Sequence, residues 1–208
     1  MKSSAAAESL PRLTAGERTR QSILDVAVDL ASVEGLDGLT IGRLATELDM
    51  SKSGLFAHFG SKEELQLATI EAAKHRFAAE VVAPALKAKR GLPRLSALCK
   101  EWIGYGQDSV FPGGCFFAAA AAEFDSRPGL VRDRIAEAMD QWIDMLRIAV
   151  RKAIEEGDLL SSIDSEQLAF EINAMLMAAN FDFQLHDDKK AFDRAKKGID
   201  RLLHHASA

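Results

Sequence analysis

The sequence lacks the features that mark several large classes of protein. Cysteine occurs only twice, at Cys99 and Cys115, and neither lies in a Cys-x-x-Cys pair, which argues against a disulfide framework. The longest apolar stretch, residues 115–122, is too short for a membrane-spanning helix, which needs about 18 residues or more. The first residues contain no apolar segment of the kind found in signal peptides. We therefore expect a cytoplasmic protein that is not inserted in a membrane.

Positive charge is also scarce. The chain has 26 Lys and Arg residues against 31 Asp and Glu residues, and its formal net charge is −5. A protein that coats nucleic acid non-specifically needs a cationic surface, so this balance argues against that class. If the protein binds DNA, its few cations must be gathered at one part of its surface.

Signals for helix starts, by contrast, are frequent. Thr14 and Ser61 are each followed three residues later by Glu, which is the capping-box pattern. Apolar residues follow at helical spacing, and no segment alternates as a strand does. Pro128 is expected at the first position of a long helix. The fold class is therefore predicted to be all-α, with further helix caps at Thr40, Ser51 and Asp164.

Residues 44–56 fit a helix-turn-helix, in which two short helices are joined by a tight turn. Ala45 is small where the helices would cross, and Asp49 stands at the turn, where the backbone φ is often positive. The outward face of the second helix has small residues, one cation, one histidine and no carboxylate, namely Lys52, Ser53, Gly54, Ala57 and His58. A solvated helix usually has Glu and Lys there, whereas small side chains allow close approach to base edges.

The N-terminal part of the sequence resembles a known family. Residues 40–65, with SKSGLFAHF at 51–59 and SKEEL at 61–65, are similar to the TetR family of transcription regulators, and the preceding helix, from Thr14 to Glu34, is similar to that family's first helix. The resemblance covers the N-terminal third of the chain, and the rest agrees with the family only in helical pattern and length. It departs from the family at Phe56, where Tyr is usual, and at Asp49, where Gly is usual. The first departure removes a phenolic donor to phosphate.

The resemblance implies that the second helix is the recognition helix and that Thr40 and Lys62 contact phosphate. Arg43 flanks the same surface. The predicted DNA-binding residues are Thr40, Arg43, Ser51, Lys52, Ser53, Gly54, Phe56, Ala57, His58 and Lys62. We expect a disordered arm at residues 1–13 and a three-helix helix-turn-helix DNA-binding domain at 14–62. A C-terminal helical bundle for ligand binding and dimerisation is expected at 63–206.

Simpler interpretations stay open for the charged residues of this surface. Lys52 and Lys62 could be solvated cations, and Arg43 could form an ion pair with Glu47 one helical turn away. His58 could pack near Phe59 rather than contact phosphate. The whole motif could also serve protein contact alone, although a surface without carboxylates argues against that.

The C-terminal part is rich in large apolar residues that could line an effector pocket between helices. The break at residues 111–117, with two adjacent glycines, would leave room for a ligand, although each of these residues could equally be plain core. The candidates are Trp102, Phe111, Cys115, Phe116, Phe117, Phe124, Trp142, Met145, Met175 and Phe181. Candidate polar contacts are Asn173, Asn180, Gln184 and His186.

The helix expected from Asp164 to His186 has two apolar stripes, and the last helix can cover only part of them. A second copy of the chain would cover the rest through a two-fold four-helix interface. The predicted interface residues are Phe170, Met177, Phe181, Phe192, Ile199 and Leu202. Such a homodimer would present two recognition helices to a palindromic operator.

No nucleophile motif, phosphate loop or acid–base pair is recognisable, so an enzyme is not expected. Cys99 and Cys115 could form a redox switch or could be buried free thiols. His204 and His205 do not face one way on a helix, so neither a metal nor another cofactor is expected. The sequence therefore predicts a repressor that a small, apolar effector releases from a double-stranded DNA operator.

Overall fold

The computed structural model describes residues 14–208, and the arm expected at residues 1–13 lies outside the described residues. Helices make up the described chain, and its one element of β structure is an isolated bridge between Leu159 and Ser207. The prediction of an all-α protein is confirmed. None of the described helices is long and apolar enough to cross a membrane.

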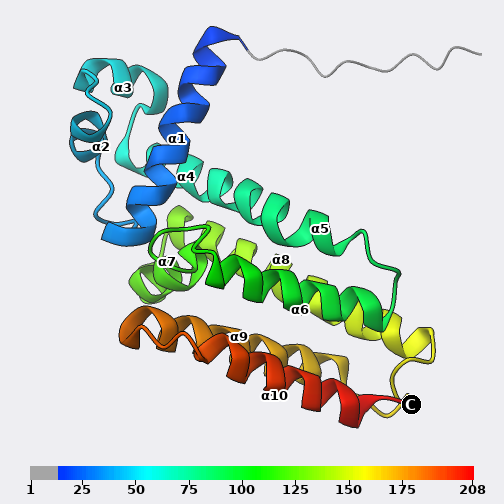
Figure 1. Ribbon diagram of the computed structural model, residues 1–208. Helices are drawn as coiled ribbons and strands as arrows, with labels where there is room; N and C mark the ends of the chain where they lie inside the picture. Colours follow the sequence, from blue (N-terminus) through cyan, green and yellow to red (C-terminus); the bar gives the residue numbers. More distant parts are fainter. Residues whose placement is uncertain (1–13) are drawn as a thin grey trace, which may run out of the picture.

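A small head is formed by α1 (Ala15–Glu34), α2 (Ile41–Glu47) and α3 (Lys52–Phe59), seen at the upper left of Figure 1. Hydroxyl groups begin all three helices: Thr14, Thr40 and Ser51 each accept a hydrogen bond from a backbone N–H three residues on. The capping box at Thr14 is complete, because the Thr14 N–H also donates to Glu17 Oε2 at 2.7 Å. The predicted helix starts of the head are therefore confirmed.

The helix α4 (Lys62–Phe77) runs out of the head into the rest of the molecule. Its capping box is only half formed: Ser61 Oγ accepts from the Glu64 N–H, but the Ser61 N–H donates to the Phe59 carbonyl instead of to Glu64. The prediction of a full capping box was wrong here because the tight turn after α3 takes that donor. A π-helical segment, η1 (Ala78–Val82), and α5 (Ala83–Ala85) continue α4.

The larger body consists of α6 (Leu92–Gln107), α7 (Phe116–Phe124), α8 (Leu130–Glu155), α9 (Ser165–His186) and α10 (Ala191–Ala206), together with most of α4. Pro128 is not the first residue of α8, as the sequence predicted. The chain turns instead at Gly129, the N-cap, whose φ of 144° disfavours any residue with a side chain.

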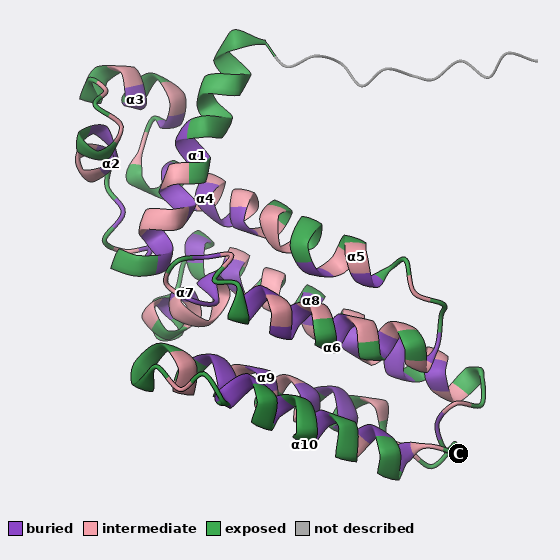
Figure 2. Cartoon of the chain, viewed as in Figure 1, coloured by how far each residue is buried: buried purple, intermediate pink, exposed green. Residues whose placement is uncertain are grey.

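Helix α8 is the central element of the body, because α4, α6, α7 and α9 all pack against it. Helices α9 and α10 form an antiparallel pair at the edge farthest from the head (Figure 1). Figure 2 shows the buried faces of α9 and α10 turned to each other and into the body, and a long exposed face on α10. The head contacts the body through α1, which packs on α4 and α7.

Candidate nucleic-acid interface and ligand cavity

The turn between α2 and α3 has the geometry expected of a helix-turn-helix. Asp49 adopts a φ of 50°, as predicted, and the following Met50 N–H donates to the Ala45 carbonyl at 3.0 Å. Leu44, Ala45 and Leu55 are buried where the two helices meet. Asp tolerates positive φ because its short polar side chain can bond locally, so the absence of Gly does not prevent the turn.

The outer face of α3 is exposed to solvent and consists mainly of small side chains. Ser51, Lys52, Ser53 and Ala57 are exposed, and Gly54 is half-buried. The ring of Phe56 is also exposed, at 54%, although a large apolar side chain costs free energy in water. Lys52 makes no ion pair within the described chain. This face therefore offers apolar contact, hydroxyl groups and one free ammonium group.

His58 lies at the edge of that face, half-buried, with its ring centroid 6.1 Å from that of Phe59. Phe59 itself is core, and the Arg20 guanidinium lies over its ring at 5.0 Å. Packing of His58 near Phe59, left open by the sequence, is thus present, and it leaves part of the imidazole accessible.

Two other predicted cations are already paired. Arg43 forms ion pairs with Glu34 at 2.6 Å and with Glu47 at 2.8 Å, which raise the pKa of its guanidinium. The Arg43–Glu47 pair was one of the two interpretations of the sequence. Lys62 Nζ lies 3.0 Å from Asp37 Oδ1. A phosphate group that binds either cation would have to compete with these carboxylates.

Asp37, in the loop between α1 and α2, joins the head to the body. Its carboxylate accepts from Arg127 at 2.8 Å as well as from Lys62, and its N–H donates to Glu123 Oε2 at 2.9 Å. The hydrogen bond from Arg127, and then the one from Lys62, hold the pKa of the Asp37 carboxyl below its usual value. Glu123 lies in the last turn of α7 and Arg127 follows its end, so these bonds tie the loop to the C-terminal end of α7.

A second junction lies in the C-terminal half of α1, close to the same loop. The Arg76 side chain, on α4, reaches Asp29 at 2.5 Å and the Asp25 carbonyl at 3.2 Å. The Gly113 N–H donates to Ser32 Oγ at 3.1 Å, and a Cβ at Gly113 would lie 1.7 Å from the Ser32 carbonyl oxygen. Only glycine fits against the α1 backbone at this position.

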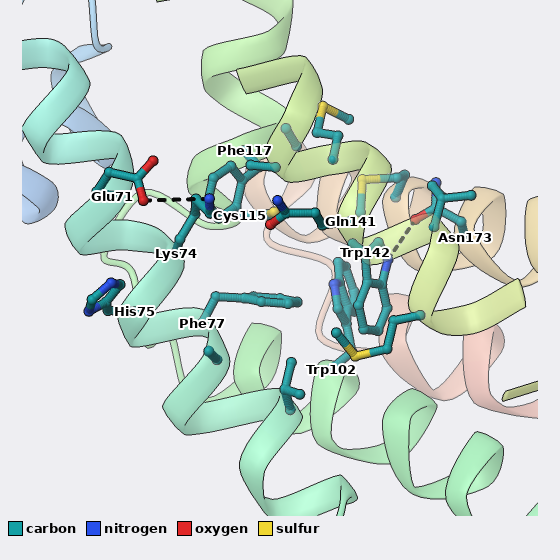
Figure 3. Close-up of a pocket in the computed structure, with 18 residues that line it drawn as sticks. Glu71, Lys74, His75, Phe77, Trp102, Cys115, Phe117, Gln141, Trp142 and Asn173 are labelled. Atoms are coloured by element: carbon teal, nitrogen blue, oxygen red, sulfur yellow. Dashed lines mark hydrogen bonds and ion pairs between the residues drawn. The ribbon is translucent and has the colours of Figure 1, made fainter. Parts of the chain in front are cut away.

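A cavity of about 260 Å³ opens within the body between α4, α6, α7, α8 and α9. Aromatic rings form much of its wall: Phe77 meets Trp142 edge to face at 5.3 Å and Phe117 at 6.2 Å, and Trp102 lies beside them (Figure 3). Both tryptophans of the chain line this cavity. Such a wall suits an apolar or aromatic ligand.

Polar groups lie on two sides of the cavity, and Gln141 lies between them (Figure 3). Glu71 and Lys74 of α4 form an ion pair at 3.5 Å, and Glu71 is also paired with Arg134 at 2.7 Å. On the opposite side, Trp142 Nε1 donates to Asn173 Oδ1 at 3.0 Å. The Asn173 oxygen is therefore occupied, whereas its NH₂ group can donate to a ligand.

Comparison with known proteins identifies the family to which this combination of head and body belongs. Residues 23–69 match the family model described as bacterial regulatory proteins, tetR family, and residues 91–199 match that of the tetracyclin repressor-like C-terminal domain. The chain belongs to the TetR family.

Individual relatives agree with that assignment. The HTH-type transcriptional regulator SrpR of Pseudomonas putida is 22% identical over 148 residues, which cover 71% of this chain and 67% of that protein. A TetR transcriptional regulator from Chloroflexus aurantiacus superposes with a TM-score of 0.85 at 23% identity, covering 92% of this chain and 97% of that one.

The structure of AibR in complex with isovaleryl coenzyme A and operator DNA has a TM-score of 0.68 at 21% identity, with coverage of 86% and 95%. Likenesses of such low identity establish the fold. Together with the family models, they make the chain a DNA-binding transcription regulator of the TetR family, as the sequence predicted.

The structure of this TetR-family chain corrects the predicted pocket. Five of the predicted apolar residues line the cavity, namely Trp102, Cys115, Phe117, Trp142 and Met145. Of the candidate polar contacts, Asn173 lines it as well. Five others do not line it, namely Phe111, Phe116, Phe124, Met175 and Phe181.

Each misplaced residue has another neighbour. Phe111 and Phe116 pack on each other at 5.9 Å in the core, and Phe124 lies under the Arg127 guanidinium. Met175 packs on α10 at Gly198, and Phe181 is 59% exposed. Among the polar candidates, Asn180 accepts from the Cys115 N–H, Gln184 covers Gly114, and the His186 ring lies beside Phe181. Sequence reasoning missed Phe77, Val82, Met139, Ile143 and Met177 as cavity residues.

The two cysteines are buried and not bonded to each other. Burial raises the pKa of the Cys99 thiol to about 12, and it also raises the pKa of Cys115. Both thiols are therefore poor nucleophiles at neutral pH. No group of three His, Cys, Asp or Glu residues in the described part of the chain could hold a metal ion.

The predicted dimer face also needs correction. Phe170 and Phe181 are 65% and 59% exposed on α9. Phe192 and Ile199 are buried inside the chain, because the strongly amphipathic α10 turns them toward α6 and α9, so they cannot meet a second copy. Leu202 is half-buried against α9, and Met177 lines the cavity. Leu185, which was not among the interface residues predicted from the sequence, is 62% exposed on the same face of α9 as Phe181.

Proposed function

We propose that this TetR-family regulator is a homodimeric repressor that leaves a palindromic operator when a small, mainly apolar effector fills the cavity of the body. The observation that supports this most strongly is the position of the cavity. Two of the helices that wall it, α4 and α7, are also those that contact the head. We place the DNA-binding domain at residues 14–62 and the effector and dimerisation domain at 63–206.

The exposed face of α3 is proposed to enter the major groove. Lys52, the free cation of this face, would contact phosphate or a base edge, and Ser53 and Ala57 would approach bases closely. Arg43 and Lys62 would exchange their carboxylate partners for phosphate. Thr40 and Ser51, which cap α2 and α3, place helix N-termini toward the DNA backbone.

Helix α7 offers a route by which an effector changes the head. Cys115, Phe117 and Ala118, at the start of the helix, line the cavity, and Glu123 near its end holds the Asp37 N–H. A ligand that pushes the start of α7 outward would therefore displace the loop between α1 and α2. The effector would favour those dimers in which the two recognition helices have the wrong spacing.

The exposed apolar stripe of α9 is proposed to pack on its symmetry-related copy. Phe170, Phe181 and Leu185 are each more than half exposed, and the exposed Ala174 and Ala178 between them allow close approach of a second helix. A two-fold axis through this stripe would make the contact isologous and would double the DNA surface read.

The test begins with an operator selected from a random DNA pool by the full-length protein. Apolar aromatic compounds are then titrated against the complex while DNA release is followed by fluorescence anisotropy and cavity occupancy by tryptophan fluorescence. We expect compounds that quench the tryptophans to release the DNA. A compound that saturates the cavity and leaves operator affinity unchanged would contradict the proposed control by effector.

A further inference from the structure

A second groove adjoins the cavity on the side away from the head. It has a volume of about 300 Å³ and lies between α5, the start of α6 and α8. The Met145 side chain lines both the cavity and this groove. The two spaces thus meet at Met145, whose flexible, unbranched side chain can change rotamer at low cost.

The same helices form the walls on both sides of Met145. Along the continuous α4–η1–α5 element, Val82 lines the cavity and Leu86 lines the groove. Along α8, Trp142 lines the cavity and Lys152 the groove, and these two residues are about 15 Å apart along the helix axis. The cavity and the groove therefore lie one after the other along the same two helices, and we call the two together the trough.

The groove differs from the cavity in charge. Arg90, Arg94 and Lys152 line it, and no carboxylate is among its lining residues. Lys152 is paired with Glu155, which lies beside the groove. Arg90 and Arg94 have no carboxylate within ion-pair distance among the residues that the structure describes.

The Arg94 guanidinium is held in place by the carbonyl groups of Leu86 and Ala88, at 3.3 and 2.9 Å. Its positive charge is thus fixed but not neutralised. Leu86 and Ile148, which also line the groove, are 51% and 48% exposed. A fixed cation, a free cation and exposed apolar groups in one groove match a molecule with an apolar body and an anionic end.

We propose that the effector is an elongated amphiphile with one carboxylate, whose apolar body lies among the aromatic rings of the cavity and whose chain passes Met145 to place the carboxylate between Arg90, Arg94 and Lys152. This inference rests on the proposed function, since it names the chemical class of the effector. The carboxylate end would be the part of the ligand closest to solvent.

The test uses the full-length protein and its own two tryptophans, which both line the cavity. Fluorescence titrations compare dodecanoate, below its micelle concentration, with the uncharged dodecan-1-ol and with naphthalene. We expect dodecanoate to bind about tenfold more tightly than dodecan-1-ol, because charge-assisted hydrogen bonds are made only by the acid. Equal affinity of the acid and the alcohol would overturn the anionic site.

The double variant R90Q/K152Q is compared with K87Q/K89Q, which removes two exposed cations from outside the groove lining. We expect R90Q/K152Q to weaken dodecanoate about tenfold and to leave dodecan-1-ol within a factor of about two, while K87Q/K89Q changes neither. An equal loss in both double variants would mean that general surface charge attracts the acid, and would overturn the proposal.

Met145→Phe narrows the passage, and Met145→Leu is its volume-matched control. We expect Met145→Phe to weaken dodecanoate and to spare naphthalene, which needs only the cavity. If naphthalene quenches the tryptophans and neither amphiphile does, the proposed binding of an amphiphile along the trough is contradicted. The apolar effector cavity of the proposed function is then still supported. If naphthalene fails as well, the proposed effector site itself fails.

Discussion

The outer face of α3 and the cavity between α4 and α8 are built from opposite kinds of side chain. The face of α3 has small residues, an exposed aromatic ring and one unpaired lysine, so that a large rigid partner can come close. The cavity has large rings that surround a small partner. The two sites share no residue, and α4 and α7 extend between them. In the proposed function, the two binding chemistries are kept separate, and these two helices couple them.

The comparison would be broken most severely by loss of the dimer, because both heads would then act alone. We expect Phe181→Glu to place a charge in the proposed α9 interface and to weaken dimerisation about a hundredfold, since a buried unpaired charge is costly. Analytical ultracentrifugation measures this. Leu160→Glu, at an exposed leucine outside α9, is the control. A dimer that survives Phe181→Glu would move the interface elsewhere.

The junction between head and body can be broken by one methyl group. Gly113→Ala places a Cβ against the Ser32 carbonyl oxygen, and we expect a loss of about 3 kcal/mol in the free energy of unfolding. Gly104→Ala is a matched control, because a Cβ there meets nothing within 4 Å and alanine favours the helix. Urea unfolding should separate the two variants. Equal stability of both would show that the close contact at Gly113 is relaxed at no cost.

Lys52→Ala tests the outer face of α3 without disturbing the body. We expect operator affinity to fall by roughly 2 kcal/mol per dimer, about thirtyfold, and the salt slope of log K to decrease by about two. The gel-shift assay is repeated with Lys87→Ala, an exposed lysine far along the chain. Unchanged affinity for Lys52→Ala, with the dimer intact, would remove α3 from the DNA interface.

The hydrogen bonds of Asp37 are expected to contribute less than these residues, both to stability and to the release of DNA by an effector. Asp37→Asn weakens the bonds to Arg127 and Lys62, so we expect the effector to release DNA less completely and stability to fall by about 0.5–1 kcal/mol. The control is Asp140→Asn on the exposed side of α8. An unaltered effector response would exclude the α7 route.

This stability difference has a defined pH dependence. Because Arg127 and Lys62 lower the pKa of Asp37 in the folded chain, the contribution is present above the unfolded pKa of about 4 and is lost as the pH falls through the folded value. Urea titrations of the wild type and Asp37→Asn should therefore differ at pH 7 and converge as the pH falls through the folded pKa of Asp37.

The smallest effect is expected at the cysteines. Burial raises the pKa of Cys99 to about 12 and also that of Cys115, so neither thiol should react with a thiol-specific reagent at pH 8 within minutes. Both should react in denaturant. Rapid native reaction at Cys115 alone would mean that the cavity opens widely and often.

The head could be predicted in more detail than the body because its signals are local. The caps at Thr14, Thr40 and Ser51 and the turn at Asp49 each depend on a few neighbouring residues. The cavity depends instead on which way each helix is rotated. Phe116 and Phe117 are adjacent in the sequence, yet the first lies in the core and the second in the cavity wall.

Other features had no signal in the sequence at all. Asp37 meets Arg127 and Glu123 across 90 and 86 residues, and no spacing rule brings such partners together. The apolar stripes of α9 and α10 indicated that their surface must be covered. Whether the same chain or a second copy covers it depends on how the helices pack. For this reason Phe192, an expected interface residue, is instead covered by Trp102 and Phe183.

The ion pairs beside α3 have a consequence for how the protein searches a chromosome. Because Arg43 and Lys62 are already neutralised by carboxylates, non-cognate DNA gains little by attracting them and few bound counterions are released. We expect most copies to be free in solution rather than sliding on random sequence. Occupancy of the operator would then follow the number of copies of the regulator in the cell closely. A small change in the expression of the regulator would therefore change the activity of the promoter.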